Sequence, residues 1–571
     1  MKFLCIISVI AISLSAHALD REAFTFTKYD LAVRVEPEQQ RLGVRGKIML
    51  RNDSEAPQRS LSLQISSSLG WSSIRLEGKP AEFVSQIYTS DIDHTGALSE
   101  AIVVLPTGVA PKQTIELEVG YEGVIPQDTT RLTRIGVPAE TAKHSDWDQI
   151  GRSFTAVRGI GYVAWYPVSG VAVSLTDGNA VPGSVATWKK RESQAEMKVS
   201  IADSRLSAEE SPELLCNGTE SKRTTTEAGA GESTGLDCSF NSLGETIPTF
   251  VVAPYTEMDS NGIAIRYLPD HRTLAENFGS AVEEVSPLVT KWFGDHRESP
   301  QDKPKVIDLP DAKGASFESG NMLLISLSGS DTKLLLTATQ QITHAFFPSP
   351  RAWIHDGLAS YAQVRLIEEK ETGQAAINYL QAHRTALMDL EKVSGEPNRE
   401  KDSLVSSLDV FRIQTKSMYV WWMLRDMVGE NALYAALHNY KASDDRDPSY
   451  MQKLIEAQAH RDLQWFFDDW VYHDRGLPDF RIISVYPGAL ASGGYMVTVT
   501  VENLGEAGAE VPVTLRLQSG EESQRLTVPG KAKASVRIQA ASLPQEVTVN
   551  DGSVPEPDTS NNGFKVESVN H

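Results

Sequence analysis

The sequence predicts a multidomain α+β protein, and three successive patterns of hydrophobic periodicity along its 571 residues support that prediction. Apolar and polar residues alternate through the first part of the chain, which is typical of strands with one buried face. Helical spacing follows, and alternation then returns to the end of the chain. We therefore expect an N-terminal antiparallel β-sheet domain over 19–255, an α-helical domain over 256–480, and a C-terminal immunoglobulin-like β-sandwich over 481–571.

The first 18 residues are typical of a secretory signal peptide. Lys2 precedes an almost unbroken apolar run over 3–14, and Ala16-His17-Ala18 fits a small-x-small cleavage site. The run is too short to span a bilayer comfortably, and no later stretch approaches the length of a membrane helix. We expect an exported protein, periplasmic or secreted, that starts near Leu19 and has no membrane span in the mature chain.

Two cysteines remain once Cys5 leaves with the signal peptide. Cys216 and Cys238 bracket a polar segment that is expected to form a long hairpin loop. In an oxidising compartment such a pair predicts a disulfide. Closing this loop would contribute about 3 kcal/mol through loop-closure entropy.

The charge balance excludes one class of partner. The formal net charge is −21 at pH 7, and binding to a phosphate backbone needs clustered Lys and Arg. We therefore expect no nucleic-acid partner.

Within the sheet domain, alternating apolar residues mark individual strands, and Gly and Pro separate them. Examples are Leu31, Val33 and Val35, then Leu61, Leu63 and Ile65, then Ile115, Leu117 and Val119.

The helical domain begins with helical spacing over 274–293, where Pro287 predicts a kink or break. Short strands are expected at 305–309 and 321–327. Further helices are expected at 333–347, from about 353, and at 375–393, 417–428, 431–440 and 450–472. Gly476-Leu477-Pro478 is typical of the end of a helical region.

The sandwich is predicted from alternating strands at 497–501, 511–517 and 547–549, with turns at 503–505 and 519–520. The tail from Pro555 is polar, and we expect it to be loosely held.

Three separated phrases resemble the M1 family of zinc aminopeptidases, which are gluzincins. Phe250 to Tyr255 is similar to the end of the family's first domain. Trp353 to Tyr361 is similar to its Trp-Leu-Asn-Glu-Gly-Phe-Ala-x-Tyr segment, and Trp470 to Pro478 is similar to the segment that closes its helical region. The resemblance covers roughly residues 20–480. It implies that the helical domain has the thermolysin-like fold and that the cofactor, if the chain binds one, is zinc.

The family's zinc motif is altered here. In H-E-x-x-H, two His on one helix face bind zinc, and the Glu between them polarises the bound water. The resemblance places Gln340 at the first His, Gln341 at the general base and His344 at the second His, with Asp356 at the third ligand. A carboxamide is a weak zinc ligand and Gln341 cannot accept a proton, so zinc binding and catalysis are both put in doubt. The interval from His344 to Asp356 is also shorter than is usual in the family.

Two other family elements are weakened. The segment Gly314 to Ser319 resembles the exopeptidase motif, which makes Glu318 the candidate for holding a substrate's free amine. Gln414 stands where the family has the Tyr that hydrogen-bonds the oxyanion, and an amide donor could serve that role. His355 is a candidate rescue ligand, but as a neighbour of Asp356 it is expected to point to a different side of its helix.

These observations favour an exported M1 aminopeptidase-like protein that is catalytically impaired or inactive and binds peptides or a protein partner. The alternative is an active zinc metallo-aminopeptidase with rearranged ligands, such as His344, His355 and Asp356. Convergence of these groups with Glu318 on one cavity would favour that alternative. A third hypothesis assigns binding of other exported proteins to the two β domains. Whether the chain is an enzyme stays open at this point.

Overall fold

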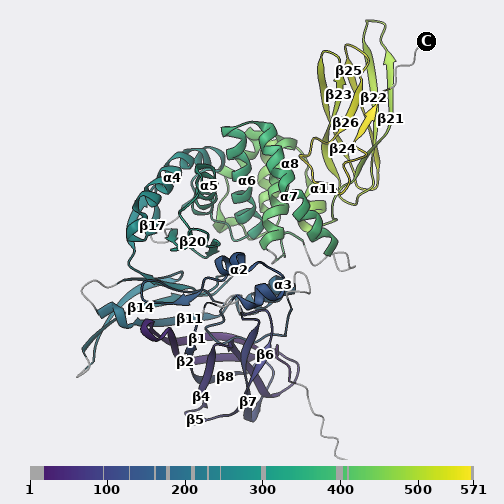
Figure 1. Ribbon diagram of the computed structural model, residues 1–571. Helices are drawn as coiled ribbons and strands as arrows, with labels where there is room; N and C mark the ends of the chain where they lie inside the picture. Colours follow the sequence, from purple (N-terminus) through teal and green to yellow (C-terminus); the bar gives the residue numbers. More distant parts are fainter. Residues whose placement is uncertain are drawn as a thin grey trace, which may run out of the picture. The chain divides into compact units, whose positions relative to one another are not determined.

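The computed structural model describes residues 19–93, 95–125, 127, 129–159, 163–174, 180–207, 212–227, 231–244, 246–297, 304–393, 403–407 and 410–566. The expected signal peptide lies outside the described residues. The chain forms two compact units, Met1–Ala253 and Pro254–His571, and each is described by itself (Figure 1). The predicted combination of an N-terminal sheet region, a helical region and C-terminal strands is confirmed.

The first unit is built on an eight-stranded sheet. Its order is β13 (Thr219–Glu227), β14 (Gly231–Phe240), β11 (Glu196–Asp203), β1 (Phe24–Glu36), β2 (Arg41–Asn52), β8 (Thr114–Val124), β4 (Leu69–Leu76) and β5 (Lys79–Pro80). In β1 the predicted alternation is confirmed, because Leu31, Val33 and Val35 are buried between exposed neighbours. The prediction of a purely antiparallel sheet is wrong at one place, because β1 pairs with β11 in parallel.

Two smaller sheets and short helices complete this unit. One sheet has the order β3 (Gln58–Ser66), β7 (Ala97–Val109), β6 (Glu82–Thr89), and the other has the order β12 (Glu213–Cys216), β15 (Phe250–Ala253), β10 (Thr155–Val157), β9 (Gln149–Ile150). The helices are α1 (Thr130–Arg134), α2 (Ala139–Ser145) and α3 (Ala180–Glu192). Strand β3 is buried on both faces, since Leu61 and Leu63 are buried and so are Ser62 and Gln64 between them.

The predicted disulfide is present between Cys216 and Cys238. Cys216 ends β12 of the four-stranded sheet, and Cys238 lies in β14 of the eight-stranded sheet. The polar segment between them includes β13, which pairs with β14 in antiparallel register. The disulfide therefore joins two sheets as well as closing the predicted hairpin.

The second unit begins with a mixed five-stranded sheet. Its order is β16 (Thr256–Ser260), β17 (Ile263–Tyr267), β18 (Lys305–Asp308), β20 (Met322–Ile325) and β19 (Phe317–Ser319). Strands β17, β18 and β20 are parallel, and the two edge strands run antiparallel to their neighbours. Two of the five strands, β18 and β20, were predicted from the sequence.

Helix α4 (Arg272–Phe293) lies between β17 and β18 in the chain, and the other α-helices of this unit follow the sheet (Figure 1). They are α5 (Asp331–Phe346), α6 (Ala352–Lys370), α7 (Gly373–Val393), α8 (Val410–Val428), α9 (Glu430–His438), α10 (Tyr450–Ala459) and α11 (Gln464–Phe467), with a π-helical turn at Asp468–Tyr472. Helix α4 continues through Pro287 without the predicted break. The expected single helix over 450–472 is wrong, because His460 adopts a left-handed backbone with φ of 51° and ends α10.

Helices α5 and α6 are joined by a short link that contains Pro348 and Pro350. Ser330 caps α5, since its hydroxyl accepts a hydrogen bond from the backbone N–H of Lys333. The prolines after Phe346 cannot continue the helix, which explains why α5 ends there. Helix α6 therefore starts immediately beside the C-terminal end of α5.

Helix α8 carries a buried charge cluster, which we call the Asp474 cluster. The carboxylate of Asp474 pairs with the guanidinium of Arg412 and with the ammonium of Lys416. The side chains of Lys416 and Asp474 are 0% and 2% exposed. Nζ of Lys416 also lies 5.6 Å from the ring centre of Trp470. The cluster therefore fastens the segment after the π-helical turn to α8.

The C-terminal strands form two antiparallel sheets. One has the order β21 (Phe480–Ala489), β22 (Tyr495–Asn503), β25 (Lys533–Ala540), and the other has the order β24 (Gly520–Val528), β23 (Ala509–Leu517), β26 (Glu546–Val549), β27 (Gly563–Lys565). The predicted inward-facing positions are buried in both sheets, including Val497, Val499 and Val501 of β22 and Val511, Val513 and Leu515 of β23.

The expectation of a loosely held tail is wrong for its described part. Glu556 is 0% exposed and accepts hydrogen bonds from the backbone of Phe480 and from the side chains of Asn550 and Asn562. Residues Gly563–Lys565 then add a strand beside β26. The polar composition of the tail does not indicate that the buried carboxylate of Glu556 will accept a hydrogen bond from Phe480 of β21.

The buried Glu556 predicts a pH dependence of stability. Burial raises the pKa of its carboxyl to about 7, against the partial opposition of its three donors. Between about pH 4.5 and 7 the unfolded chain releases this proton while the folded chain keeps it, so stability falls as the pH rises through this window. We expect Glu556 to contribute about 2–3 kcal/mol at pH 5 that is absent at pH 8.

Urea unfolding of wild type and Glu556→Gln at pH 5 and pH 8 measures this contribution. The pH dependence of other groups cancels in the comparison of the two proteins. An equal difference in unfolding free energy between wild type and variant at the two pH values would contradict the prediction.

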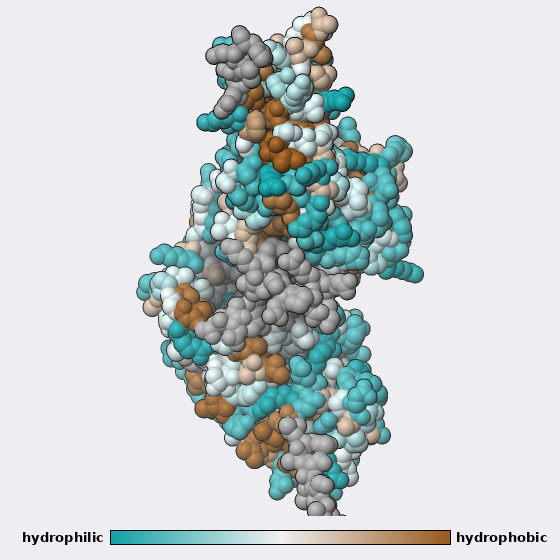
Figure 2. Space-filling view, turned by 90° about the vertical axis from the view of Figure 1, so that its right-hand side faces the viewer, coloured by the Kyte–Doolittle hydropathy of each residue, from teal (hydrophilic) through white to brown (hydrophobic). Residues whose placement is uncertain are grey.

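The surface is mainly hydrophilic on the face shown in Figure 2, where hydrophobic residues form separate small patches. This agrees with the net charge of −21. Among the described helices, none has both the length and the apolar composition that crossing a lipid bilayer requires.

Candidate functional site

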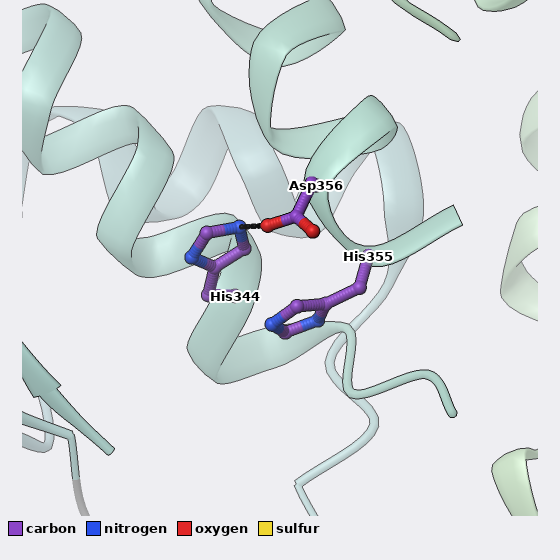
Figure 3. A group of neighbouring side chains, drawn as sticks. All are labelled: His344, His355 and Asp356. Atoms are coloured by element: carbon purple, nitrogen blue, oxygen red, sulfur yellow. Dashed lines mark ion pairs between the residues drawn. The ribbon is translucent and has the colours of Figure 1, made fainter. Parts of the chain in front are cut away.

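His344 lies at the centre of a group of side chains from three elements. Its Nδ1 donates a hydrogen bond to Oε1 of Glu318, the middle residue of β19, at 2.6 Å. Its Nε2 lies 3.5 Å from Oδ1 of Asp356 in the first turns of α6 (Figure 3). The histidine side chain is 8% exposed, whereas Glu318 and Asp356 are 26% and 21% exposed. The resemblance placed His344, Asp356 and Glu318 at one site, and the structure brings them together.

His355 also joins this group, although it was expected to lie on a different side of α6 from Asp356. Its ring stacks on the ring of His344, with ring centres 4.2 Å apart and planes inclined by 16° (Figure 3). Neighbouring residues of a helix differ in direction by about 100°. His344, near the end of α5, points between the side chains of His355 and Asp356, so both side chains can contact its ring. We call Glu318, His344, His355 and Asp356 the His344 cluster.

Gln340 lies one turn before His344 on α5 and supports the cluster from outside. Its Nε2 donates to Oε2 of Glu318 at 3.2 Å, and its Oε1 accepts from Nε2 of Gln363 at 3.4 Å. Gln363 also donates to the backbone oxygen of Leu336 and accepts from the hydroxyl of Tyr379. The oxygen and the nitrogen of the Gln340 carboxamide therefore both form hydrogen bonds. This geometry does not favour the prediction that Gln340 is a metal ligand.

Gln341 and Gln414 are the two predicted catalytic amides. Gln341 is 3% exposed, and among the described residues its Nε2 has no hydrogen-bond partner, although the carboxamide lies near enough to Glu318 to help lower the pKa of that carboxyl. Gln414 lies in α8 and is half-buried. Within the described part of the chain it forms no hydrogen bond with any member of the His344 cluster.

The charges of the cluster depend on one another. Burial alone would lower the pKa of His344, but the carboxylates of Glu318 and Asp356 outweigh it and raise that pKa to about 10. Burial, together with repulsion from cationic His344, lowers the pKa of His355 to about 4. For Glu318 and Asp356, burial would raise the pKa, but His344 lowers both below their usual values. At neutral pH the cluster holds two carboxylates, one imidazolium and one neutral imidazole.

The donor set fits a zinc-like cation. A ring nitrogen of His344, a ring nitrogen of His355 and a carboxylate oxygen of Asp356 all lie within 4.8 Å of one another. Among the described residues, Nε2 of His344 and Nδ1 of His355 are buried without a hydrogen-bond partner. Ligands about 2.0–2.2 Å from a tetrahedral zinc ion lie about 3.3–3.6 Å apart. The 3.5 Å between Nε2 of His344 and Oδ1 of Asp356 already matches that spacing, whereas a pair at the 4.8 Å limit would have to close by about 1 Å. When bound, such an ion would supply Lewis-acid chemistry at this position.

Sequence reasoning named His355 only as a candidate rescue ligand and missed Gln363. His355 was misplaced because the direction of His344 relative to α6 depends on how two helices pack. Gln363 was not considered, although it follows Asp356 by seven residues and such spacing returns to the same helix face. That spacing was the available signal, but it does not show that a Gln will reach a residue of another helix.

Comparisons with known proteins give one kind of match. No protein-family model matches the chain, and no curated protein matches it. Among solved structures, the chain is similar to three crystal structures of an M1 zinc metallopeptidase from Deinococcus radiodurans. They comprise the metallopeptidase itself, a glutamate-to-alanine mutant and the same mutant bound to a Tyr-Ser-Ala substrate. Each match has 16% sequence identity and a TM-score of 0.45, and covers 80–81% of this chain and 96–97% of the other.

Proposed function

We propose that this chain is an exported peptidase-like protein that binds peptides or a protein segment at the His344 cluster without hydrolysing them. The observation that supports this most directly is the absence of a proton acceptor where the resemblance requires one. Gln341 occupies that position, and a carboxamide cannot take a proton from water near neutral pH.

The nearest carboxylate is poorly suited to replace the missing base. Glu318 is bonded to His344 and Gln340, and its pKa is lowered by the charge of His344. A general base works best when its pKa lies near the operating pH. Glu318 therefore positions His344 in this proposal and does not act as a catalytic residue.

The charge of the cluster supports an amine-bearing ligand. With His344 protonated and His355 neutral, the two carboxylates leave one net negative charge at a site where Glu318 and Asp356 are about a quarter exposed. A peptide's free α-ammonium group is attracted to such a site, whereas an acetylated N-terminus is not.

The alternative is a metal-dependent peptidase with rearranged ligands. One observation favours it, namely the convergence of His344, His355 and Asp356. It still requires a base, and Asp356 in this hypothesis is committed to the metal. We therefore retain the non-hydrolytic function as the proposal.

Hydrolysis of a panel of amino-acid arylamides tests the proposal, with and without added zinc and with and without a chelator. We expect no turnover by wild type above the protein-free rate under any of these conditions. The variant Gln340→His with Gln341→Glu restores the two missing groups and serves as the matched comparison. Chelator-sensitive turnover by wild type would overturn the proposal.

Binding is measured separately by fluorescence anisotropy, using tripeptides labelled at the C-terminus. We expect peptides with a free N-terminus to bind at least tenfold more tightly than their acetylated forms, because only the former carry the ammonium group. Equal affinities would remove the argument for an amine-bearing ligand at this cluster.

A further inference from the structure

We propose that His344, His355 and Asp356 bind a divalent transition-metal cation, and that His355 serves as the ligand that position 340 does not supply. Two of the three residues come from consecutive positions of α6, and the third comes from α5 (Figure 3). Such a ligand set differs from an arrangement with two histidines one turn apart on a single helix.

The orientation of His344 favours a cation at its second nitrogen. Its Nδ1 donates to Glu318 at 2.6 Å, which directs Nε2 away from β19. Metal-binding histidines commonly donate their other ring N–H to a carboxylate in this way. Nε2 is buried and lacks a hydrogen-bond partner among the described residues, although Asp356 lies 3.5 Å away. The protein therefore holds a buried nitrogen beside a carboxylate at the place where a cation would bind.

His355 supplies the third donor, since one of its ring nitrogens lies within 4.8 Å of the ligand atoms of His344 and Asp356. Its ring lies against that of His344 at 4.2 Å between centres, and its Nδ1 is buried and has no partner within the described chain. A buried imidazole nitrogen without a partner costs free energy, and a cation would remove that cost.

Gln340 has a supporting role in this arrangement. Its carboxamide binds Oε2 of Glu318 and is itself held by Gln363, so Glu318 is fixed from both oxygens. A series of hydrogen bonds therefore runs from Gln363 through Gln340 and Glu318 to Nδ1 of His344. Residues that orient a ligand in this manner commonly change metal affinity by about 10–100-fold when they are replaced.

The donor types select the class of metal. Two imidazole nitrogens and one carboxylate oxygen suit Zn²⁺ and neighbouring transition metals, whereas Ca²⁺ and Mg²⁺ prefer oxygen ligands throughout. Three protein ligands also leave a coordination position for a further ligand on a four-coordinate ion. A cation can bind here with or without hydrolysis. It would displace the proton from Nε2 of His344, so the net negative charge that supports an amine-bearing ligand belongs to the cation-free cluster.

The test uses the full mature chain without a histidine tag, stripped of metal by a chelator and then titrated with Zn²⁺ in competition with a chromophoric chelator. We expect one high-affinity site per chain. His344→Ala and His355→Ala should each weaken binding at least tenfold, and Glu318→Gln should weaken it by about 10–100-fold through His344. His473→Ala is the matched control, because this histidine is largely exposed and lies outside the cluster. The Zn²⁺ affinity of this variant should equal that of wild type.

A second readout is the visible absorption spectrum with Co²⁺ in place of Zn²⁺. Loss of the His355 ligand should change the intensity and position of the bands, whereas His473→Ala should not. Circular dichroism and unfolding midpoints of the metal-free variants separate ligand loss from misfolding. The proposal is overturned if wild type binds no Zn²⁺ at one equivalent, or if His355→Ala retains wild-type affinity and spectrum while His344→Ala loses them.

Discussion

Replacing Asp474 with alanine is expected to lower the free energy of unfolding by about 3–5 kcal/mol, because it removes the carboxylate that pairs with two buried cations. Arg412 and Lys416 both pair with this carboxylate, and the Lys416 side chain is 0% exposed. Neither cation can reach water without rearrangement of α8. The loss should appear as a lower urea midpoint for the full chain.

The control for this prediction is an exposed ion pair. Glu276 pairs with Arg272 on the surface of α4, where both side chains are more than half exposed. Glu276→Ala should leave the urea midpoint unchanged, since screened surface pairs contribute little. A loss below 1 kcal/mol for Asp474→Ala would show that the two cations find other partners or water when the carboxylate is removed.

Gly357→Ala is expected to cost about 3 kcal/mol, at the upper end of the usual range for overpacking. A Cβ at this position would lie 2.5 Å from Cβ of Ser417 and 3.1 Å from Nε1 of Trp421. Both contacts are on α8, and neither comes from the far end of a flexible side chain. The two helices must therefore move apart, and Asp356, the residue immediately before Gly357, must move with α6.

Two measurements follow from that displacement. The urea midpoint should fall, and the Zn²⁺ affinity of the remaining folded protein should also fall because Asp356 shifts relative to His344. Gly373→Ala is the matched control, since the nearest atom to a Cβ there is 3.9 Å away. Adding Ser417→Gly to Gly357→Ala removes the closest contact and should restore part of both losses. If the double variant is no better than Gly357→Ala alone, contact with Ser417 is not the cause.

Much of the fold followed from local pattern. Strands β1 and β22 and helix α5 were predicted because hydrophobic spacing within one segment determines them. The disulfide was predicted because only two cysteines remain after the expected signal peptide. The parallel pairing of β1 with β11 was not predicted, since it joins segments far apart in the sequence. His460 likewise interrupts a helical pattern through its backbone conformation, which composition alone does not indicate.

The sequence predicted which residues belong to the candidate site better than it predicted how they are arranged. His344, Asp356 and Glu318 were identified from motif resemblance, and the structure places them in contact. The role of His355 depended on the angle at which α6 meets α5, and the role of Gln340 depended on the position of Gln363. Both are properties of packing between elements, so no spacing rule within one element could supply them.

The proline-containing link between α5 and α6 has a consequence for how readily the site assembles. Pro348 and Pro350 restrict the conformations of the unfolded chain at the point where the two helices turn back on each other. His344, His355 and Asp356 all lie within this single helical hairpin, so little chain entropy is lost in bringing them together. The contacts among these three residues join positions close in sequence, and proteins rich in such local contacts fold faster than those dominated by distant pairings.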